Sequence, residues 1–65
     1  MKDNELRKKV KLLKATGAIV NYYEIAELLE MTEKSFYNWL SGYYDLGEKK
    51  RKLLIQIEQD LYIPQ

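Results

Sequence analysis

The sequence predicts a compact, all-α domain of four helices over residues 1–65, and three observations support this prediction. Gly17, Gly42, Gly47 and Pro64 divide the chain into blocks of helix length, with no linker, repeat or low-complexity segment between them. Within each block, apolar residues recur at the spacing of one helix face. No block shows the sustained alternation of polar and apolar residues that is typical of a strand.

The first helix is expected over residues 4–16. One of its faces is apolar, at Leu6, Val10 and Leu13. A second face is basic, at Arg7, Lys11 and Lys14. We interpret this basic face as a solvated surface. Gly17 then suits the left-handed residue that ends many helices.

The second helix is expected over residues 22–29. Asn21 is a good N-cap, and Glu24 follows it at the spacing of a capping box. Val20 before the cap and Ile25 after it are placed to form a hydrophobic staple. The side chains expected to point into the core are Ile25, Ala26, Leu28 and Leu29.

The third helix is expected over residues 33–41, and it begins with the same signals. Thr32 is its predicted N-cap, with Ser35 at the third helical position, and Met31 can form a staple with Phe36. Its inward side chains are Phe36, Trp39 and Leu40, and Gly42 closes it. Two short helices joined by so tight a turn form a helix-turn-helix unit.

The fourth helix follows the loop 43–47 and ends before Pro64. Asp45 and Glu48 have the spacing of a capping pair at its start. Its apolar face is expected at Leu53, Leu54, Ile57 and Leu61.

Residues 25–42 resemble the helix-turn-helix of phage repressors of the lambda and Cro type. The shared features are an aliphatic residue followed by Ala26, an apolar Met31 before the N-cap, the apolar Phe36, and Gly42 after the second helix. Ala26 lies where the two helices cross, and a larger side chain would hold them apart. Glu30 departs from the pattern, which usually has Gly there. Glu30 must therefore adopt a left-handed backbone, or the turn must differ.

The resemblance implies a DNA-binding domain with its motif at about residues 22–42 and its second motif helix in the major groove. By position, the residues expected to read base edges are Glu33, Lys34, Tyr37 and Asn38. The residues expected to contact the DNA backbone are Tyr22, Tyr23, Thr32, Ser35, Tyr43, Tyr44, Lys49 and Lys50.

The distribution of charge supports DNA binding less than the resemblance does. The net charge of +1 combines +4 in residues 1–14, −4 in residues 15–33, +3 in residues 34–52 and −2 in residues 53–65. The acidic residues of the motif recur every three positions, at Glu24, Glu27, Glu30 and Glu33. If they faced phosphates they would weaken binding, and the basic run 49–52 could offset them.

Composition bounds the other functions. The 65 residues contain no cysteine and no histidine, so thiolate metal sites, disulfides and histidine acid–base chemistry are excluded. Ser35 and Ser41 have no evident base, so we expect neither an enzyme nor a cofactor or metal. The polar start of the chain and the lack of an apolar run of about 18 residues predict a cytoplasmic protein, without a membrane partner.

Two functions from different classes remain. The first is a sequence-specific, DNA-binding transcriptional regulator of phage or mobile-element type, a repressor for example. It would bind double-stranded DNA as a homodimer, with residues 61–63 as candidates for the dimer surface. The alternative is a protein-binding module that retains the helix-turn-helix shape. It would engage a protein partner through its acidic and tyrosine-rich surface.

Overall fold

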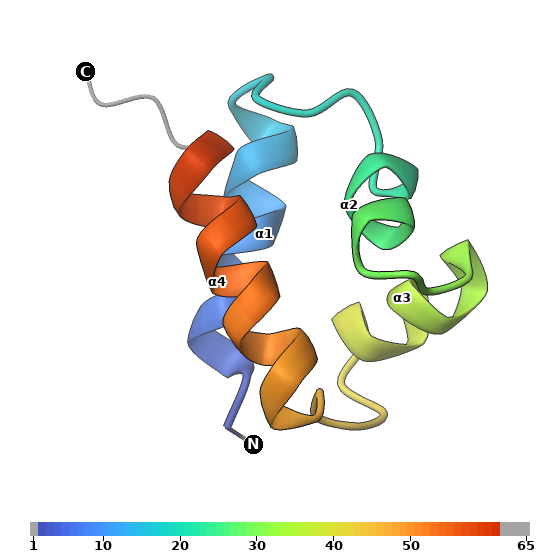
Figure 1. The fold of residues 1–65 in the computed structure, drawn as a ribbon. Coiled ribbons are helices and arrows are strands. Elements are labelled where there is room, and N and C mark those ends of the chain that lie inside the picture. Colours follow the sequence, from blue (N-terminus) through green and yellow to red (C-terminus); the bar gives the residue numbers. More distant parts are fainter. Residues whose placement is uncertain (1, 62–65) are drawn as a thin grey trace.

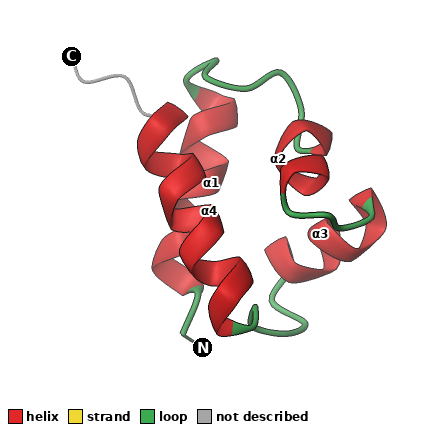
Figure 2. Ribbon diagram, viewed as in Figure 1, coloured by secondary structure: helices red, strands yellow, loops and turns green. Residues whose placement is uncertain are grey.

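The computed structural model describes residues 2–61 and confirms the prediction of four helices, which are the regular elements of this part of the chain (Figures 1 and 2). They are α1 (Asn4–Ala15), α2 (Tyr23–Leu28), α3 (Glu33–Leu40) and α4 (Glu48–Leu61). α1 and α4 lie side by side and run in the same direction, while α2 packs against α3. None of these helices has the length and apolar content that crossing a membrane would require.

The core is one apolar cluster to which all four helices contribute. Its fully buried large side chains include Trp39, Phe36, Ile25, Leu29 and Leu54. Three core residues lie outside the helices: Ile19, Leu29 and Leu46. Most of the predicted inward residues are thus confirmed.

Three apolar predictions are wrong. Leu28 is 58% exposed and Leu53 is 45% exposed, although both were expected in the core. α2 is only six residues long, and its buried face is taken by Ile25 and Ala26, which leaves Leu28 on the solvent side. Val20 is 79% exposed, so the staple predicted between Val20 and Ile25 does not form.

The predicted helix starts are partly confirmed. The Thr32 hydroxyl accepts a hydrogen bond from the Ser35 N–H at 3.1 Å, as an N-cap does. Asn21 does not cap α2, whose N-cap position is Tyr22, and no side chain caps this end. The carboxylate of Glu24 instead accepts a hydrogen bond from the Val20 N–H at 3.1 Å.

The capping pair predicted at the start of α4 is replaced by a long-range contact. The carboxylate of Asp45 accepts hydrogen bonds from the Lys2 N–H at 3.3 Å and from Nη2 of Arg7 at 3.4 Å. Asp45 therefore joins the loop before α4 to the start of the chain.

The first three helices end in the same backbone motif, in which the first residue after the C-cap has a positive φ. This residue is Gly17 after α1 (φ 84°), Glu30 after α2 (φ 58°) and Gly42 after α3 (φ 91°). After α2, the N–H of Glu30 donates to the Glu27 carbonyl at 3.0 Å, and the N–H of Met31 donates to the Ala26 carbonyl at 2.9 Å. This pair of bonds defines a Schellman motif. Glu30 thus adopts the left-handed backbone, which costs about 1 kcal/mol relative to glycine.

The carboxylate of Asp3 is buried and connects three other parts of the chain. Asp3 occupies the N-cap position of α1, yet its side chain makes no cap bond and is only 1% exposed. Its Oδ2 accepts hydrogen bonds from Nε1 of Trp39 at 2.8 Å and from the Leu46 N–H at 2.7 Å. Its Oδ1 accepts a hydrogen bond from Nε of Arg51 at 2.7 Å, which is also an ion pair. Asp3 therefore links the start of α1 to α3, to the loop before α4, and to α4.

Arg7 is buried too, which corrects its placement on a solvated basic face. It is 5% exposed, and its guanidinium carbon lies 5.1 Å from the centroid of the Trp39 ring. Its Nε donates a hydrogen bond to the Trp39 carbonyl, and its Nη2 donates one to the Tyr44 carbonyl at 2.6 Å. Arg7 thereby fixes the end of α3 and the loop that follows it.

The surroundings of Asp3 favour its charged form. Burial raises the pKa of this carboxyl, but hydrogen bonds from Trp39, Arg51 and Leu46 and the charge of Arg51 outweigh burial, so the pKa lies below its ordinary value of 3.8. Because the folded state binds this proton less tightly than the unfolded chain does, Asp3 stabilises the fold at neutral pH. That contribution is lost as the pH falls below about 5 and through the lowered pKa.

We predict that Asp3→Asn lowers the free energy of unfolding at pH 7 by about 1–3 kcal/mol. The substitution replaces one accepting oxygen with an NH₂ group, which cannot accept the hydrogen bonds that the buried donors offer. It should also flatten the loss of stability between about pH 5 and pH 2, since the titrating group is gone. Urea unfolding at a series of pH values measures both effects. Asp60→Asn, at an exposed position of α4, is the control and should keep the wild-type pH dependence. An Asp3→Asn protein with wild-type stability and acid sensitivity would contradict this account.

Candidate nucleic-acid interface

The residues predicted to read bases lie together on one side of α3. Glu33, Lys34 and Tyr37 are exposed, and Asn38 is half-buried. On the opposite side of the same helix, Phe36, Trp39 and Leu40 are buried in the core. α3 therefore presents a polar face that carries four hydrogen-bonding groups: a carboxylate, an ammonium group, an amide and a phenol.

A cluster of two tyrosines and a lysine adjoins this face. The ring of the half-buried Tyr22 packs edge-on against Tyr37, with centroids 5.6 Å apart and planes at 87°, and its centroid lies 6.1 Å from that of Phe36. Nζ of Lys14 lies 4.8 Å from the centroid of the Tyr22 ring. Burial, and then the neighbouring Tyr37, raise the pKa of the Tyr22 phenol. The hydroxyl of Tyr22 is therefore protonated and able to donate at neutral pH.

Lys14 is a functional candidate that the sequence interpretation missed. It was assigned to a solvated face of the first helix, and nothing in its spacing indicates that it meets Tyr22. The contact depends on how α1 is oriented relative to α2, which only the three-dimensional structure defines.

Two residues predicted to contact the DNA backbone are hydrogen-bonded to each other. The Tyr44 hydroxyl donates to the Ser35 carbonyl at 2.7 Å, and the Ser35 Oγ lies 2.7 Å from the same Tyr44 oxygen. Because the single phenolic proton is engaged by the carbonyl, Ser35 is the donor in the second bond. These hydroxyls attach the loop after α3 to the start of α3.

The other predicted backbone contacts are more accessible. Tyr23 is 52% exposed and Tyr43 is 78% exposed. Thr32 is exposed, although its hydroxyl oxygen caps α3. These three residues lie at the helix starts and in the loop of the predicted motif, and Tyr22, at the start of α2, is half-buried.

Most of the basic run 49–52 has partners within the chain. Nζ of Lys50 donates a hydrogen bond to the Leu29 carbonyl at 2.8 Å, at the end of α2. Arg51 pairs with the buried Asp3, and Nζ of Lys52 lies 3.3 Å from the Glu48 carboxylate. Lys49 is exposed, and within residues 2–61 its side chain has no ion pair or hydrogen bond. This run thus offers less free positive charge than its composition suggests.

All four glutamates of the predicted motif are exposed: Glu24, Glu27, Glu30 and Glu33. Within the part of the chain that the structure describes, no group of three or more acidic side chains is arranged to hold a metal ion.

Searches of family models, curated proteins and solved structures found no match to this chain. The interpretation of this face therefore rests on its residues and their geometry.

We predict that Lys50→Met and Lys49→Met differ in their effect on folding. Lys50→Met removes the donor to the Leu29 carbonyl and should lower the free energy of unfolding by roughly 0.5–1.5 kcal/mol. Lys49→Met is the matched control and should leave stability within about 0.5 kcal/mol of wild type. Thermal or urea unfolding of both variants measures this difference. Equal stability of the two variants would show that the bond from Lys50 adds nothing to folding.

Proposed function

We propose that this chain is a sequence-specific DNA-binding protein, a transcriptional regulator of the phage or mobile-element type. In this proposal α2, the turn and α3 act as a helix-turn-helix, and α3 enters the major groove. The observation that carries the proposal is the polar face of α3, where Glu33, Lys34, Tyr37 and Asn38 occur together on one accessible side of a helix. The major groove of B-DNA is wide enough to admit an α-helix.

The chemistry of these side chains suits base edges. Lys34 can donate to the guanine O6 and N7, Asn38 can pair with the adenine N6 and N7, and Glu33 can accept from the cytosine N4. Tyr37, held against Tyr22, is 42% exposed and can contact a thymine methyl group or a phosphate. Four neighbouring side chains of different chemistry provide the means to distinguish sequences.

The charges near this face determine how strongly it can bind phosphates. Lys14 and Lys34 are exposed cations, whereas Glu24 and Glu27 are exposed anions on the adjoining helix. Phosphate contacts supply much of the affinity of DNA-binding proteins. With few free cations available, we expect weak non-specific binding and a strong dependence on the base contacts and on the presence of two half-sites.

The proposal is tested by selection from random DNA duplexes at two salt concentrations. We expect recovery of a common motif arranged as an inverted repeat, and an affinity that falls as salt rises by about 0.9 log units per phosphate contact for each tenfold change. Sequencing of the retained duplexes and titration of the best one provide the two measurements. Absence of any enriched motif at low salt would refute the proposal.

We predict that Asn38→Ala relaxes the preference for adenine at one position of the selected motif, at a cost of about 1–3 kcal/mol for that base pair. The other positions should keep their preferences. Asn21→Ala is the matched control, because Asn21 is exposed in the loop before α2 and outside the α3 face. Circular dichroism verifies that both variants are folded. If Asn38→Ala kept every base preference, the assignment of the α3 face would be wrong.

A further inference from the structure

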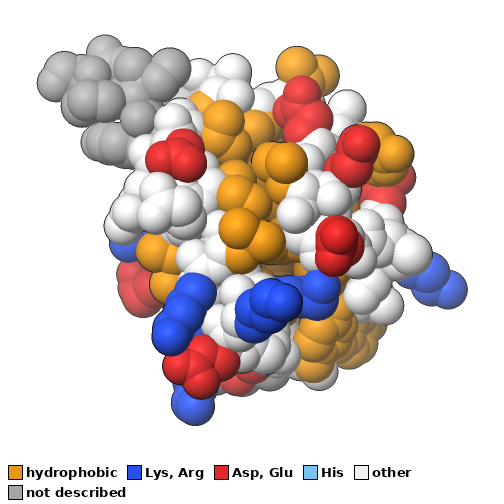
Figure 3. Space-filling model, viewed as in Figure 1, with side chains coloured by type: hydrophobic (Ala, Val, Ile, Leu, Met, Phe, Trp, Pro, Cys, Tyr) orange, Lys and Arg blue, Asp and Glu red, His pale blue; other side chains and the backbone are white. Residues whose placement is uncertain are grey.

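We propose that a second copy of this chain docks into the groove between α2 and α4, which we call the α2/α4 groove. One wall includes Leu28 and Glu30, and the other includes Gly47, Lys49, Lys50 and Leu53. The groove encloses about 580 Å³. Figure 3 shows hydrophobic side chains in a strip on this side of the molecule, with acidic groups beside the strip and basic groups below it. The proposal does not depend on DNA binding.

The apolar content of the groove is the first argument. Leu28 is 58% exposed and Leu53 is 45% exposed, and both line the groove. Two large aliphatic side chains that face one hollow gain free energy when they are covered, at about 25 cal/mol for each Å² removed from water. Adjacent exposed apolar groups of this kind mark interaction surfaces more often than isolated ones do.

The arrangement of charge indicates which partner fits. Glu30 is exposed on the α2 wall, and Lys49 is exposed on the α4 wall. Glu48, also on the α4 wall, pairs with Lys52 at 3.3 Å. Two lysines therefore leave this wall positive: Lys49, which is exposed, and Lys50, which donates to the Leu29 carbonyl. Within residues 2–61, Glu30 and Lys49 do not form an ion pair with each other.

A copy related by a two-fold axis along the groove meets both walls favourably. The rotation places α2 of one copy over α4 of the other, so Glu30 of each faces Lys49 of its partner while the leucines meet between them. Such an interface is self-complementary, as two-fold interfaces must be. A partner segment with charge of one sign would be repelled by one of the two walls.

The size of the groove determines how strong a dimer we expect. A standard interface buries about 800 Å² on each partner, which would be a sixth of the 4665 Å² that this chain exposes. The α2/α4 groove is lined by eight residues, whereas such an interface has about 20–30 residues on each side. We therefore expect a weak dimer, with a dissociation constant of about 10 μM to 1 mM.

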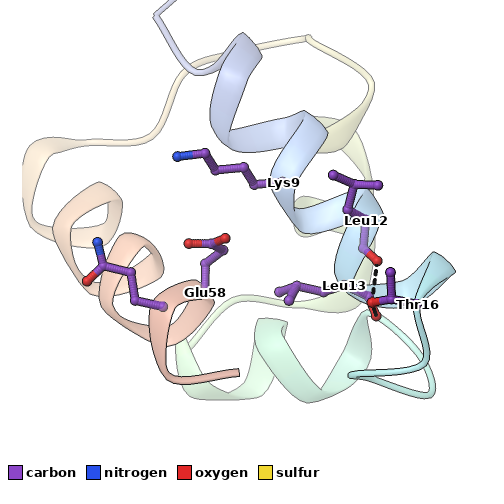
Figure 4. A pocket seen from close by; sticks show the side chains of 6 residues that line it. Lys9, Leu12, Leu13, Thr16 and Glu58 are labelled. Atoms are coloured by element: carbon purple, nitrogen blue, oxygen red, sulfur yellow. Dashed lines mark hydrogen bonds between the residues drawn. The ribbon is translucent and has the colours of Figure 1, made fainter. Parts of the chain in front are cut away.

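A second hollow, between α1 and α4, encloses the same volume and is the competing surface for a dimer. Figure 4 shows Lys9 and Glu58 on its opposite sides, with Leu12 and Leu13 beside them. Of these leucines Leu12 is 60% exposed and Leu13 is buried, so substitution of Leu12 tests this hollow as the alternative dimer surface. The dimer surface predicted at residues 61–63 stays a prediction: Leu61 is half-buried against the core, and Tyr62 and Ile63 lie outside the described residues.

The first test is sedimentation equilibrium of the full chain without DNA, over concentrations of about 0.01–1 mM. We expect reversible dimerisation, weakened at least tenfold by Leu28→Ser or by Leu53→Ser. Leu12→Ser should dimerise like the wild type. A wild-type chain that stays monomeric throughout this range would overturn the proposal, as would a dimer that only Leu12→Ser dissociates.

The second test exchanges the charges of the groove. Glu30→Lys and Lys49→Glu should each fail to dimerise alone, because each puts like charges opposite one another. Their equimolar mixture should form a heterodimer, since each lysine then faces a glutamate. A mixture that remains monomeric while the wild type dimerises would contradict the two-fold arrangement. Since both tests omit DNA, their failure leaves the proposed DNA binding to be judged by its own selection experiment.

Discussion

The buried carboxylate of Asp3 is the interaction on which the rest of this structure depends. A carboxylate is expensive to remove from water unless its oxygens are fully hydrogen-bonded, and here Trp39, Leu46 and Arg51 supply the donors. These donors come from the last turn of α3, the loop after it and α4, so satisfying one buried charge determines how three segments meet α1. Arg7 completes the arrangement, because it binds the Trp39 carbonyl and lies against the Trp39 ring. In a chain this small, apolar burial alone leaves little margin, so such a network strongly favours a single arrangement of the helices.

This network also explains why the net charge is a poor guide to the surface. Arg7 and Arg51 contribute to the basic total of the sequence, yet both are engaged in holding the fold. Lys50 likewise donates to the end of α2, across from the turn that separates α2 and α3. What remains accessible near α3 is a small number of lysines among exposed glutamates. Any polyanion bound there must therefore be recognised more by hydrogen bonding and shape than by a strong positive field.

Local features of the fold are predictable from the sequence, and long-range polar contacts are not. The helix ends at Gly17 and Gly42, the cap at Thr32 and the burial of Phe36 and Trp39 each depend on residues within one or two turns. Leu28 was misplaced because α2 is too short for spacing to define its buried face. Asp3 and Arg51 are 48 positions apart, and no periodicity connects them. For the candidate site, the accessible face of α3 follows from helix spacing, whereas the Lys14–Tyr22 contact and the pairing of Ser35 with Tyr44 require the tertiary arrangement.

Glu30 contributes both to the local backbone of the turn and to the surface of the groove between α2 and α4. Its position after α2 requires a left-handed backbone, which glycine would adopt at a cost lower by about 1 kcal/mol. The same Schellman motif uses glycine after α1 and after α3, so backbone conformation alone would favour glycine here as well. A glycine, however, would remove the only charge on the α2 wall of the groove. Within residues 2–61 the exposed carboxylate of Glu30 has no ion pair, so it is available for the contact with Lys49 of a second copy that we propose.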